Sequence, residues 1–332
     1  MSNSIVYINS TLQPWSDLYR DGDICPLHYW GYSDFQQNNL LCIKNSRIAI
    51  QLRYRLGGLD IPVLWRTYQR LKKGAKAIYL VTPPDILAAL PFLRYRFPSK
   101  PIVTWVWTAD DVRKHHRKLK HATHIFCLTE DAKEALDYHG MEKKSSFHLW
   151  GAAPEAFVDQ SEPKLEYDLN FLGLSRRDLT MINNLLESKS YSVVTTPKAA
   201  SALETTGQVQ PNLSMHELHG FSALKRILKK SRVTVIPIFS DDNQPSGYTN
   251  LVESLLCGTP VVIPKESLIP RRALYAKGVF HYEAGNYQSM KQTLTEAVKT
   301  GSDPDARQLI QESASTLFNG KSIKDSLRNL LQ

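Results

Sequence analysis

The sequence predicts an α/β fold made of two domains, each with a doubly wound parallel sheet. Short apolar runs of strand type alternate with amphipathic runs of helical spacing, which is typical of parallel sheets covered by helices. The length of 332 residues is sufficient for two domains of ordinary size. Residues 151–167 are rich in Pro and in small or acidic residues and mark a composition break. We therefore expect a first domain over residues 1–155 and a second over residues 156–317.

The composition favours a folded protein of a reducing compartment. Hydrophobic residues make up 42% and aromatic residues 10% of the chain, which indicates packed cores. No stretch approaches the twenty apolar residues of a membrane span, and the sequence MSNSIVYINS does not follow the pattern of a secretory signal. The cysteines at positions 25, 42, 127 and 257 are scattered and suggest neither a zinc site nor a disulfide framework. We expect a cytoplasmic protein, with the inner face of the membrane as an alternative location.

The net charge of +9 is concentrated in the first half of the chain. Residues 1–150 contain 21 Lys or Arg and 13 Asp or Glu, a net charge of +8, whereas residues 151–332 contain 20 and 19, a net charge of +1. A basic half suggests an anionic partner, such as a membrane surface, an acidic acceptor or nucleic acid. A basic surface without a ligand is the alternative.

In the first domain, turn residues separate apolar runs of strand length from longer runs with helical periodicity. The expected strands are residues 5–8, 77–81, 101–107, 125–129 and 146–150, and the expected helices are residues 61–73, 85–96, 112–122 and 130–139. Pro62 suits a first helical turn and Gly74 a helix end, whereas Pro91 predicts a kink or a break. The aromatic run HYWGY at residues 28–32 either packs under a loop or stacks on a sugar ring.

The second domain continues the same alternation. The expected strands are residues 168–174, 191–196, 233–238, 261–263 and 279–282, and the expected helices are residues 179–187, 218–230, 287–300, 305–317 and 322–331. Residues 197–213 are expected to form an irregular surface loop.

The motif that organises the second domain is DDNQPSGYTNLVESLLCGTPVVIP, residues 241–264. It combines an acidic loop, a Gly turn, a short helix and a buried strand. Ser246, Thr249 or Asn250 are candidate N-caps for the helix, which ends at Gly258. Gly247 permits close approach of the backbone to a ligand, and the helix start behind it presents N–H groups to an anion. The motif therefore predicts a phosphate-binding site.

The segment GYTNLVESLLCGTPVV within this motif resembles the nucleotide-sugar motif of GT-B-fold glycosyltransferases of the family 4-like group (glycosyl transferases group 1). The resemblance implies two Rossmann-like domains with parallel sheets facing across a cleft. It also implies that the C-terminal helix, about residues 318–332, returns to the first domain. The first domain would bind the acceptor and the second the nucleotide sugar.

The resemblance also assigns residues to the donor. The loop and helix start, comprising Gln244, Ser246, Gly247, Tyr248, Thr249 and Asn250, correspond to the segment that binds the diphosphate. Glu253 holds the place of a glutamate that binds the ribose hydroxyls. From the residues alone, Asn250 and Glu253 also have the spacing of a capping box, and the two roles are compatible.

Arg176 and Arg177 follow a strand and a Gly turn, in the region where the family carries a basic diphosphate clamp. Either arginine fits that role, and an exposed pair at a helix start is the alternative. The family usually has a further acid about eight residues before the ribose-binding glutamate. Pro245 stands there in this chain, and Asp242 nearby is a candidate catalytic acid.

Two further candidate catalytic residues, Asp110 and Asp111, follow the expected strand that ends at Trp107. Ligands of doubly wound sheets lie at the carboxyl ends of strands, where an Asp could accept the proton of an acceptor hydroxyl. The alternative is that one of them caps the helix expected from Val112, and Asp111 is the better cap. The basic run of residues 113–120, RKHHRKLK, binds lipid head groups or phosphates, or is a solvated face.

Together these observations predict an enzyme that moves a sugar from a nucleotide-diphosphate sugar to a hydroxyl of a glycan, lipid-linked or other acceptor, in cell-surface polysaccharide or glycoconjugate synthesis. UDP is the expected nucleotide because it is common among such enzymes. No metal and no cofactor are expected, and the family favours retention of configuration. Nucleic acid is not expected as a partner. Alternatives are a nucleotide-sugar 2-epimerase of the same fold and a non-catalytic binding protein derived from it.

Overall fold

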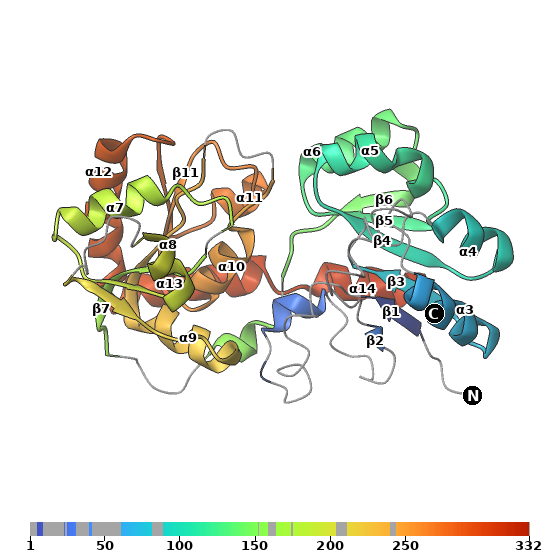
Figure 1. Cartoon of the computed structure of the whole chain (residues 1–332), viewed down its shortest axis with the longest axis horizontal. Coiled ribbons are helices and arrows are strands. Elements are labelled where there is room, and N and C mark those ends of the chain that lie inside the picture. The colour runs from blue at the N-terminus through green and yellow to red at the C-terminus, as the bar shows by residue number, and fades with distance from the viewer. Residues whose placement is uncertain are drawn as a thin grey trace. The chain divides into compact units, whose positions relative to one another are not determined.

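The computed structural model describes residues 5–8, 23, 25–30, 40–41, 61–81, 89–151, 153–158, 164–173, 175–203, 211–239 and 244–331. The chain divides into two compact units, one formed by Met1–Trp150 with Gly320–Gln332 and the other by Gly151–Asn319 (Figure 1). Each unit contains a six-stranded sheet in which all the pairings are parallel. The expected α/β fold with two parallel sheets is confirmed.

The first sheet has the strand order β2-β1-β3-β4-β5-β6. Its strands are β1 (Ile5–Ile8), β2 (Leu40–Leu41), β3 (Ala77–Leu80), β4 (Ile102–Val106), β5 (His124–Cys127) and β6 (Ser145–Phe147). Its helices are α3 (Ile61–Lys72), α4 (Leu90–Arg96), α5 (Ala109–Leu119), α6 (Glu130–Tyr138) and α14 (Lys321–Leu331), with 3-10 turns η2 (Pro26–Tyr29) and η5 (Glu142–Lys144). Every residue of β1, β3 and β4 is buried, as expected for strands covered on both faces.

Helix α14 joins the first unit although it lies far away in the sequence. Its residues Ile323, Leu327 and Leu331 recur at helical spacing and are buried. A hydrogen bond of 3.1 Å between His148 Nδ1 and Ser322 Oγ links the beginning of the helix to the segment after β6. The helix is thus an integral part of the first unit.

The second sheet has the strand order β12-β11-β10-β7-β8-β9. Its strands are β7 (Tyr167–Phe171), β8 (Val193–Thr195), β9 (Leu213–Met215), β10 (Ser231–Val235), β11 (Val261–Pro264) and β12 (Val279–Tyr282). Its helices are α7 (Leu179–Glu187), α8 (Pro197–Leu203), α9 (Gly220–Lys230), α10 (Tyr248–Leu256), α11 (Arg271–Leu274), α12 (Tyr287–Gly301) and α13 (Pro304–Leu317), preceded by the 3-10 turn η6 (Pro154–Phe157). Strands β8 and β9 follow β7 on one side of it in the sheet, and β10, β11 and β12 lie on its other side.

Two local predictions are wrong. Residues 197–203 form helix α8 rather than a loop, because Pro197 occupies the first helical turn and Ala199, Ala200 and Leu203 pack inward. Helix α5 begins at Ala109, three residues before the expected start, because Thr108 is its N-cap. Helix α4 begins at Leu90 and carries Pro91 in its first turn, a position that suits proline. Residues 85–88, the first part of that expected helix, lie outside the described residues.

Among the described helices, none has both the length and the apolar character needed to cross a membrane.

Candidate functional site

The site lies at the carboxyl ends of β7 and β10, where the strand order of the second sheet changes direction. Strands β7 and β10 are parallel neighbours, with Val233 opposite Leu169 and Thr234 opposite Asn170. The loops that leave their carboxyl ends lead to α7 and α10. In open α/β sheets the crevice between two such loops is the usual ligand site, because the loops diverge to opposite faces of the sheet.

Arg177 connects the two loops. It lies in the loop after β7, forms an antiparallel bridge with Ile238 of the loop after β10, and is only 6% exposed. Its guanidinium donates from Nη1 to the carbonyl of Ser175 at 2.9 Å and from Nη2 to Asn250 Oδ1 at 3.0 Å. Asn250 belongs to the first turn of α10. A permanent positive charge is therefore fixed at the start of this helix.

Two glycines make room for this guanidinium. A Cβ atom on Gly173 would lie 2.8 Å from Arg177 Nη2 and 3.0 Å from Asn250 Oδ1. A Cβ on Gly247 would lie 3.4 Å from the same Nη2 atom and 2.4 Å from Ile236 Cγ2. Gly247 also has a φ of +83°, a backbone conformation that L side chains rarely adopt. Both positions therefore require glycine for the arginine and the helix start to approach this closely.

Helix α10 presents its first turn beside this charge. Its N-cap is Gly247, which contributes no side-chain acceptor, so the predicted caps Ser246, Thr249 and Asn250 are wrong. Within the described part of the chain, the backbone N–H groups of Thr249 and Asn250 donate to no protein acceptor. Free N–H groups and the helix dipole both favour an anion at this end. We call Arg177, Gly247 and the N–H groups of residues 249 and 250 the anion seat.

A buried polar chain below the seat fixes α10 to both central strands. Asn170 Nδ2 of β7 donates to Thr234 Oγ1 of β10 at 2.9 Å, and Thr234 Oγ1 is 2.8 Å from Ser254 Oγ of α10. All three side chains are essentially inaccessible to solvent. The sequence signal was a polar residue in the middle of each apolar strand, in DLNF and VTVI, and we did not select these residues as candidates.

Glu253 lies one helical turn beyond Asn250 and is 2% exposed. Because α10 begins at Tyr248, Glu253 is too far along the helix to reach back to its start, and the capping-box alternative with Asn250 is wrong.

Cys257 lies one further turn along, at the end of α10. Burial raises the pKa of Cys257 to about 12, so this thiol stays protonated at neutral pH and is a poor nucleophile.

The remaining candidate donor-binding residues differ in their exposure to solvent. Gln244, Ser246 and Thr249 are partly exposed, whereas Tyr248 is 2% exposed and packs into the core of the unit. Arg176 is exposed and has a φ of +57°, so its backbone directs it differently from Arg177. The structure therefore joins Arg177 and Asn250 by a hydrogen bond, next to the space that Gly247 leaves open. Asp242 lies outside the described residues.

In the first unit, Asp110 and Asp111 occupy the first turn of α5, after the carboxyl end of β4. Asp111 belongs to a capping box: its backbone N–H donates to Thr108 Oγ1 at 3.2 Å, and its Oδ2 accepts from the Thr108 N–H at 3.1 Å. Asp110 forms an ion pair with Arg113 at 2.5 Å, and its side chain is 34% exposed. Asp111 thus has a structural task, while Asp110 remains accessible.

The aromatic run HYWGY packs into the first unit where it is described. Trp30 is 2% exposed and stacks on Trp150 at 4.6 Å and on Trp107 at 6.0 Å between ring centroids. Burial lowers the pKa of His28 to about 4, which leaves this imidazole neutral at pH 7. The packing alternative holds for Trp30, whereas residues 31 and 32 lie outside the described residues.

Several solved structures resemble the whole chain. The Anabaena HepE protein bound to UDP aligns with a TM-score of 0.69 and 13% identity, covering 99% of each chain. A sucrose-phosphate synthase from Thermosynechococcus elongatus also aligns with a TM-score of 0.69, at 11% identity and 98% coverage of each chain. The chain has the GT-B fold. No protein-family model and no curated protein sequence matches it.

The GT-B fold is not restricted to transferases. A Listeria monocytogenes protein assigned as a UDP-N-acetylglucosamine 2-epimerase aligns with a TM-score of 0.59 and 12% identity. The alignment covers 98% of this chain and 95% of the other. Identities this low establish a common fold, and the activity must be argued from the residues of this chain.

Proposed function

We propose that this chain is a glycosyltransferase that moves a sugar from a UDP-sugar to a hydroxyl group of a glycan, lipid-linked or other acceptor, in cell-surface polysaccharide or glycoconjugate synthesis. The observation that carries the proposal is the anion seat at the switch point of the second sheet. A buried arginine, a left-handed glycine and free helix N–H groups converge there. They suit a diphosphate, whose two phosphate groups need several donors and a compensating charge.

In this mechanism the seat acts on the leaving group. Negative charge grows on the nucleotide diphosphate as the bond to the sugar breaks, and Arg177 and the N–H groups of α10 offset it. These donors are held in place by Asn250 and by the polar chain below, so little reorganisation is needed at the moment of reaction. Because a fixed guanidinium supplies the compensating charge, the reaction is proposed to be independent of metal. Retention of configuration is proposed from the sequence resemblance.

Glu253 is proposed to accept hydrogen bonds from the ribose hydroxyls. It lies one helical turn along α10 from Asn250, the hydrogen-bond partner of Arg177. Gln244, Ser246, Thr249 and Asn250 would surround the phosphates, with Tyr248 supporting the helix start from the core. Asp110 is the proposed general base for the acceptor hydroxyl, and Asp242 is a second candidate acid.

The acceptor is proposed to bind the first unit. Helix α5 exposes Lys114 and Arg117 to solvent while Val112 and Leu119 are buried. This basic face suits an anionic or lipid-linked acceptor and contact with the head groups of a membrane surface. The proposed location is the cytoplasm or the inner face of a membrane.

The donor site is tested by thermal unfolding with UDP, GDP, ADP and CMP. Ligand at a hundred times its dissociation constant stabilises a fold by about 2.7 kcal/mol, and we expect this effect with UDP. Arg177→Lys removes the planar guanidinium group but keeps the charge, and Glu253→Gln keeps the size but removes the carboxylate. Both variants should weaken UDP binding. The matched controls are Arg176→Lys and Glu187→Gln, which alter exposed side chains of the same unit and should bind UDP normally. Stabilisation by no nucleotide would overturn the proposal.

The epimerase is the second candidate, because a structure of that class aligns over nearly the whole chain. Product analysis separates the two. A transferase releases UDP from UDP-glucose when acceptor is present, whereas an epimerase converts UDP-N-acetylglucosamine into its 2-epimer.

A further inference from the structure

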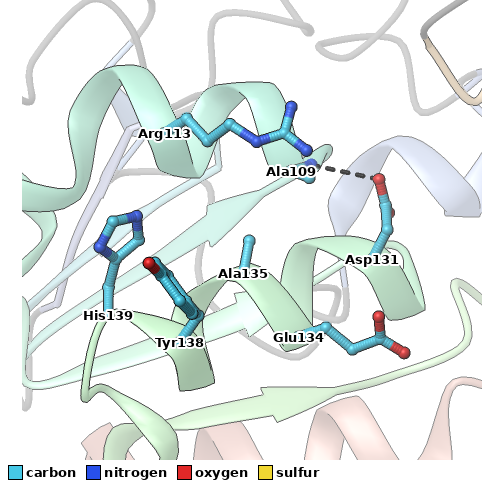
Figure 2. Close-up of a pocket in the computed structure, with 7 residues that line it drawn as sticks. All are labelled: Ala109, Arg113, Asp131, Glu134, Ala135, Tyr138 and His139. Carbon is cyan, nitrogen blue, oxygen red and sulfur yellow. Dashed lines mark hydrogen bonds between the residues drawn. The ribbon is translucent and has the colours of Figure 1, made fainter.

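A surface groove of about 470 Å³ lies between helices α5 and α6 of the first unit (Figure 2). Its floor is formed by Ala109 of α5 and Ala135 of α6. Because both side chains are single methyl groups, the space between the two helices stays open along their outer surface. The groove belongs to the first unit, whereas the anion seat belongs to the second.

One end of the groove is rigidly built. The Asp131 carboxylate accepts from the Ala109 N–H at 3.3 Å through Oδ2, the contact dashed in Figure 2, and from the Ala132 N–H at 2.8 Å through Oδ1. The bond from Ala109 ties the first turns of the two helices together, and the bond from Ala132 orients the carboxylate. Arg113 lines the same end and is held by its ion pair with Asp110. The Asp131 carboxylate is thus held in place by backbone N–H groups, whereas Arg113 is held only by a surface ion pair.

The other end of the groove carries an exposed aromatic ring. Tyr138, in the last turn of α6, is 88% exposed, so its ring is accessible to a ligand. Beside it, His139 packs edge-on against Tyr138 at 5.4 Å and stacks flat on His116 at 4.3 Å. The ring of Tyr138 therefore stands at the rim of the groove on an ordered base (Figure 2).

Glu134 lies between these two ends. Residues 131, 134, 135 and 138 share one face of α6, because helix positions three and four apart are neighbours. Glu134 is exposed, and within the described residues it has no ion pair and no hydrogen bond. Its carboxylate is thus available to a ligand in the groove.

The charges of the groove favour an uncharged, hydroxyl-rich ligand. The lining holds one Arg and two acids, a net charge of +1 − 2 = −1, with Arg113 already paired to Asp110. Desolvation, His116 and Lys120 lower the pKa of His139, so this imidazole is neutral at pH 7 and adds no charge. Phosphates and nucleotides are disfavoured next to two carboxylates. Carboxylates accept hydrogen bonds from hydroxyl groups, and an aromatic face covers the C–H side of a sugar ring.

We propose that the α5–α6 groove is a binding site for a neutral saccharide, with Tyr138 as the stacking platform and Glu134 and Asp131 as acceptors for sugar hydroxyls. The volume lies within the usual range for small-molecule sites, roughly 300–1,000 Å³. This site is separate from the donor site and does not depend on the proposed transferase activity.

The experiment measures binding of maltose, cellobiose and N,N′-diacetylchitobiose to the full chain by saturation-transfer difference NMR and calorimetry. We expect at least one disaccharide to bind the wild type, and Tyr138→Ala to weaken that binding about tenfold. Glu134→Gln, which removes a charge without changing size, should weaken it by a smaller factor. The matched control is Tyr95→Ala, since Tyr95 of α4 is 84% exposed and lies outside the groove.

Three results would overturn the proposal. They are binding of none of the disaccharides, equal binding by wild type and Tyr138→Ala, and binding of trilysine in place of the sugars. UDP binding measured on the same samples separates the two sites. Tyr138→Ala should bind UDP normally, and Glu253→Gln should bind the disaccharide normally. Failure of the donor site therefore leaves this test intact.

Discussion

Two separate requirements make Gly247 a position for glycine. Its φ is +83°, and a Cβ atom there would lie 2.4 Å from Ile236 Cγ2. We predict that Gly247→Ala lowers the free energy of unfolding of the second unit by about 2–4 kcal/mol, through left-handed strain and the clash together. The variant should also bind UDP more weakly, because the N–H groups of α10 shift. Urea unfolding followed by circular dichroism and UDP titration measure the two effects.

The control for this prediction is Gly285→Ala. Gly285 has a similar φ of +72° but nothing within 4 Å of the added Cβ, so only the backbone strain of about 1–2 kcal/mol remains. UDP binding should be unchanged in this variant. Equal losses of stability in the two variants would show that the contact with Ile236 has no energetic weight.

At the scale of the element, the start of α5 separates a structural acid from a candidate catalytic one. We predict that Asp111→Ala and Thr108→Ala each destabilise the first unit by about 1 kcal/mol, because each removes half of the capping box. Urea unfolding followed by tryptophan fluorescence reports on this unit alone, since all six tryptophans lie within residues 1–150.

Asp110→Asn is predicted to lower the rate of sugar transfer strongly and the stability of the first unit only slightly. Its ion pair with Arg113 is half-exposed, so its loss should cost only about 0.2–1 kcal/mol. If Asp110 is the general base, sugar transfer should slow by a factor of about 10²–10⁴ while UDP binding stays the same. Unchanged transfer rates in this variant would remove Asp110 from the mechanism.

The sequence was most informative where periodicity was strong and least where a turn set the boundary. Helix α7 and strand β12 have the predicted bounds. In α7 the buried residues recur at helical spacing, and Asp178 caps the start. The start of α5 was misplaced because Asp111 was preferred as the cap over Thr108, whose side chain in fact caps the helix. The start of α10 was wrongly capped because the left-handed backbone of Gly247 cannot be read from the letters. Helix α8 was missed because its buried face consists mainly of alanines.

In the site, too, the local motif could be predicted from the sequence, whereas contacts between distant residues could not. The Gly247 turn and the helix behind it could be read from the motif, whereas the choice between Arg176 and Arg177 could not. That choice depends on which arginine the chain turns inward, a result of the bridge between Arg177 and Ile238. Residues 177 and 250 are far apart in the sequence, so their contact emerges only from the pairing of β7 with β10.

At the scale of the whole molecule, a hydrogen-bonded chain links the first sheet to α14. His124 Nε2 is 2.8 Å from Ser146 Oγ, which is 2.9 Å from His148 Nε2, and His148 contacts Ser322. Burial and then His148 lower the pKa of His124 from 6.5 to about 4, and burial lowers the pKa of His148. Between these pH values the unfolded chain binds protons that the folded unit does not.

We therefore predict that the first unit loses stability as the pH falls from about 6.5 towards 4. Urea midpoints from tryptophan fluorescence at pH 7.5, 6 and 5 measure the loss. His124→Gln cannot titrate and should show a smaller drop than the wild type over the same range. Identical drops would mean that His124 contributes nothing to the pH dependence.

The placement of α14 also has a consequence for biosynthesis. The second unit is one uninterrupted stretch, residues 151–319, whereas the first needs residues 320–331 to bury Ile323, Leu327 and Leu331 against its core. The ribosome therefore completes the second unit while the first, although begun earlier, still exposes the surface that α14 covers. Domains generally fold as units during synthesis. We expect the order of folding to run against the order of translation, with the first unit the one in need of chaperones.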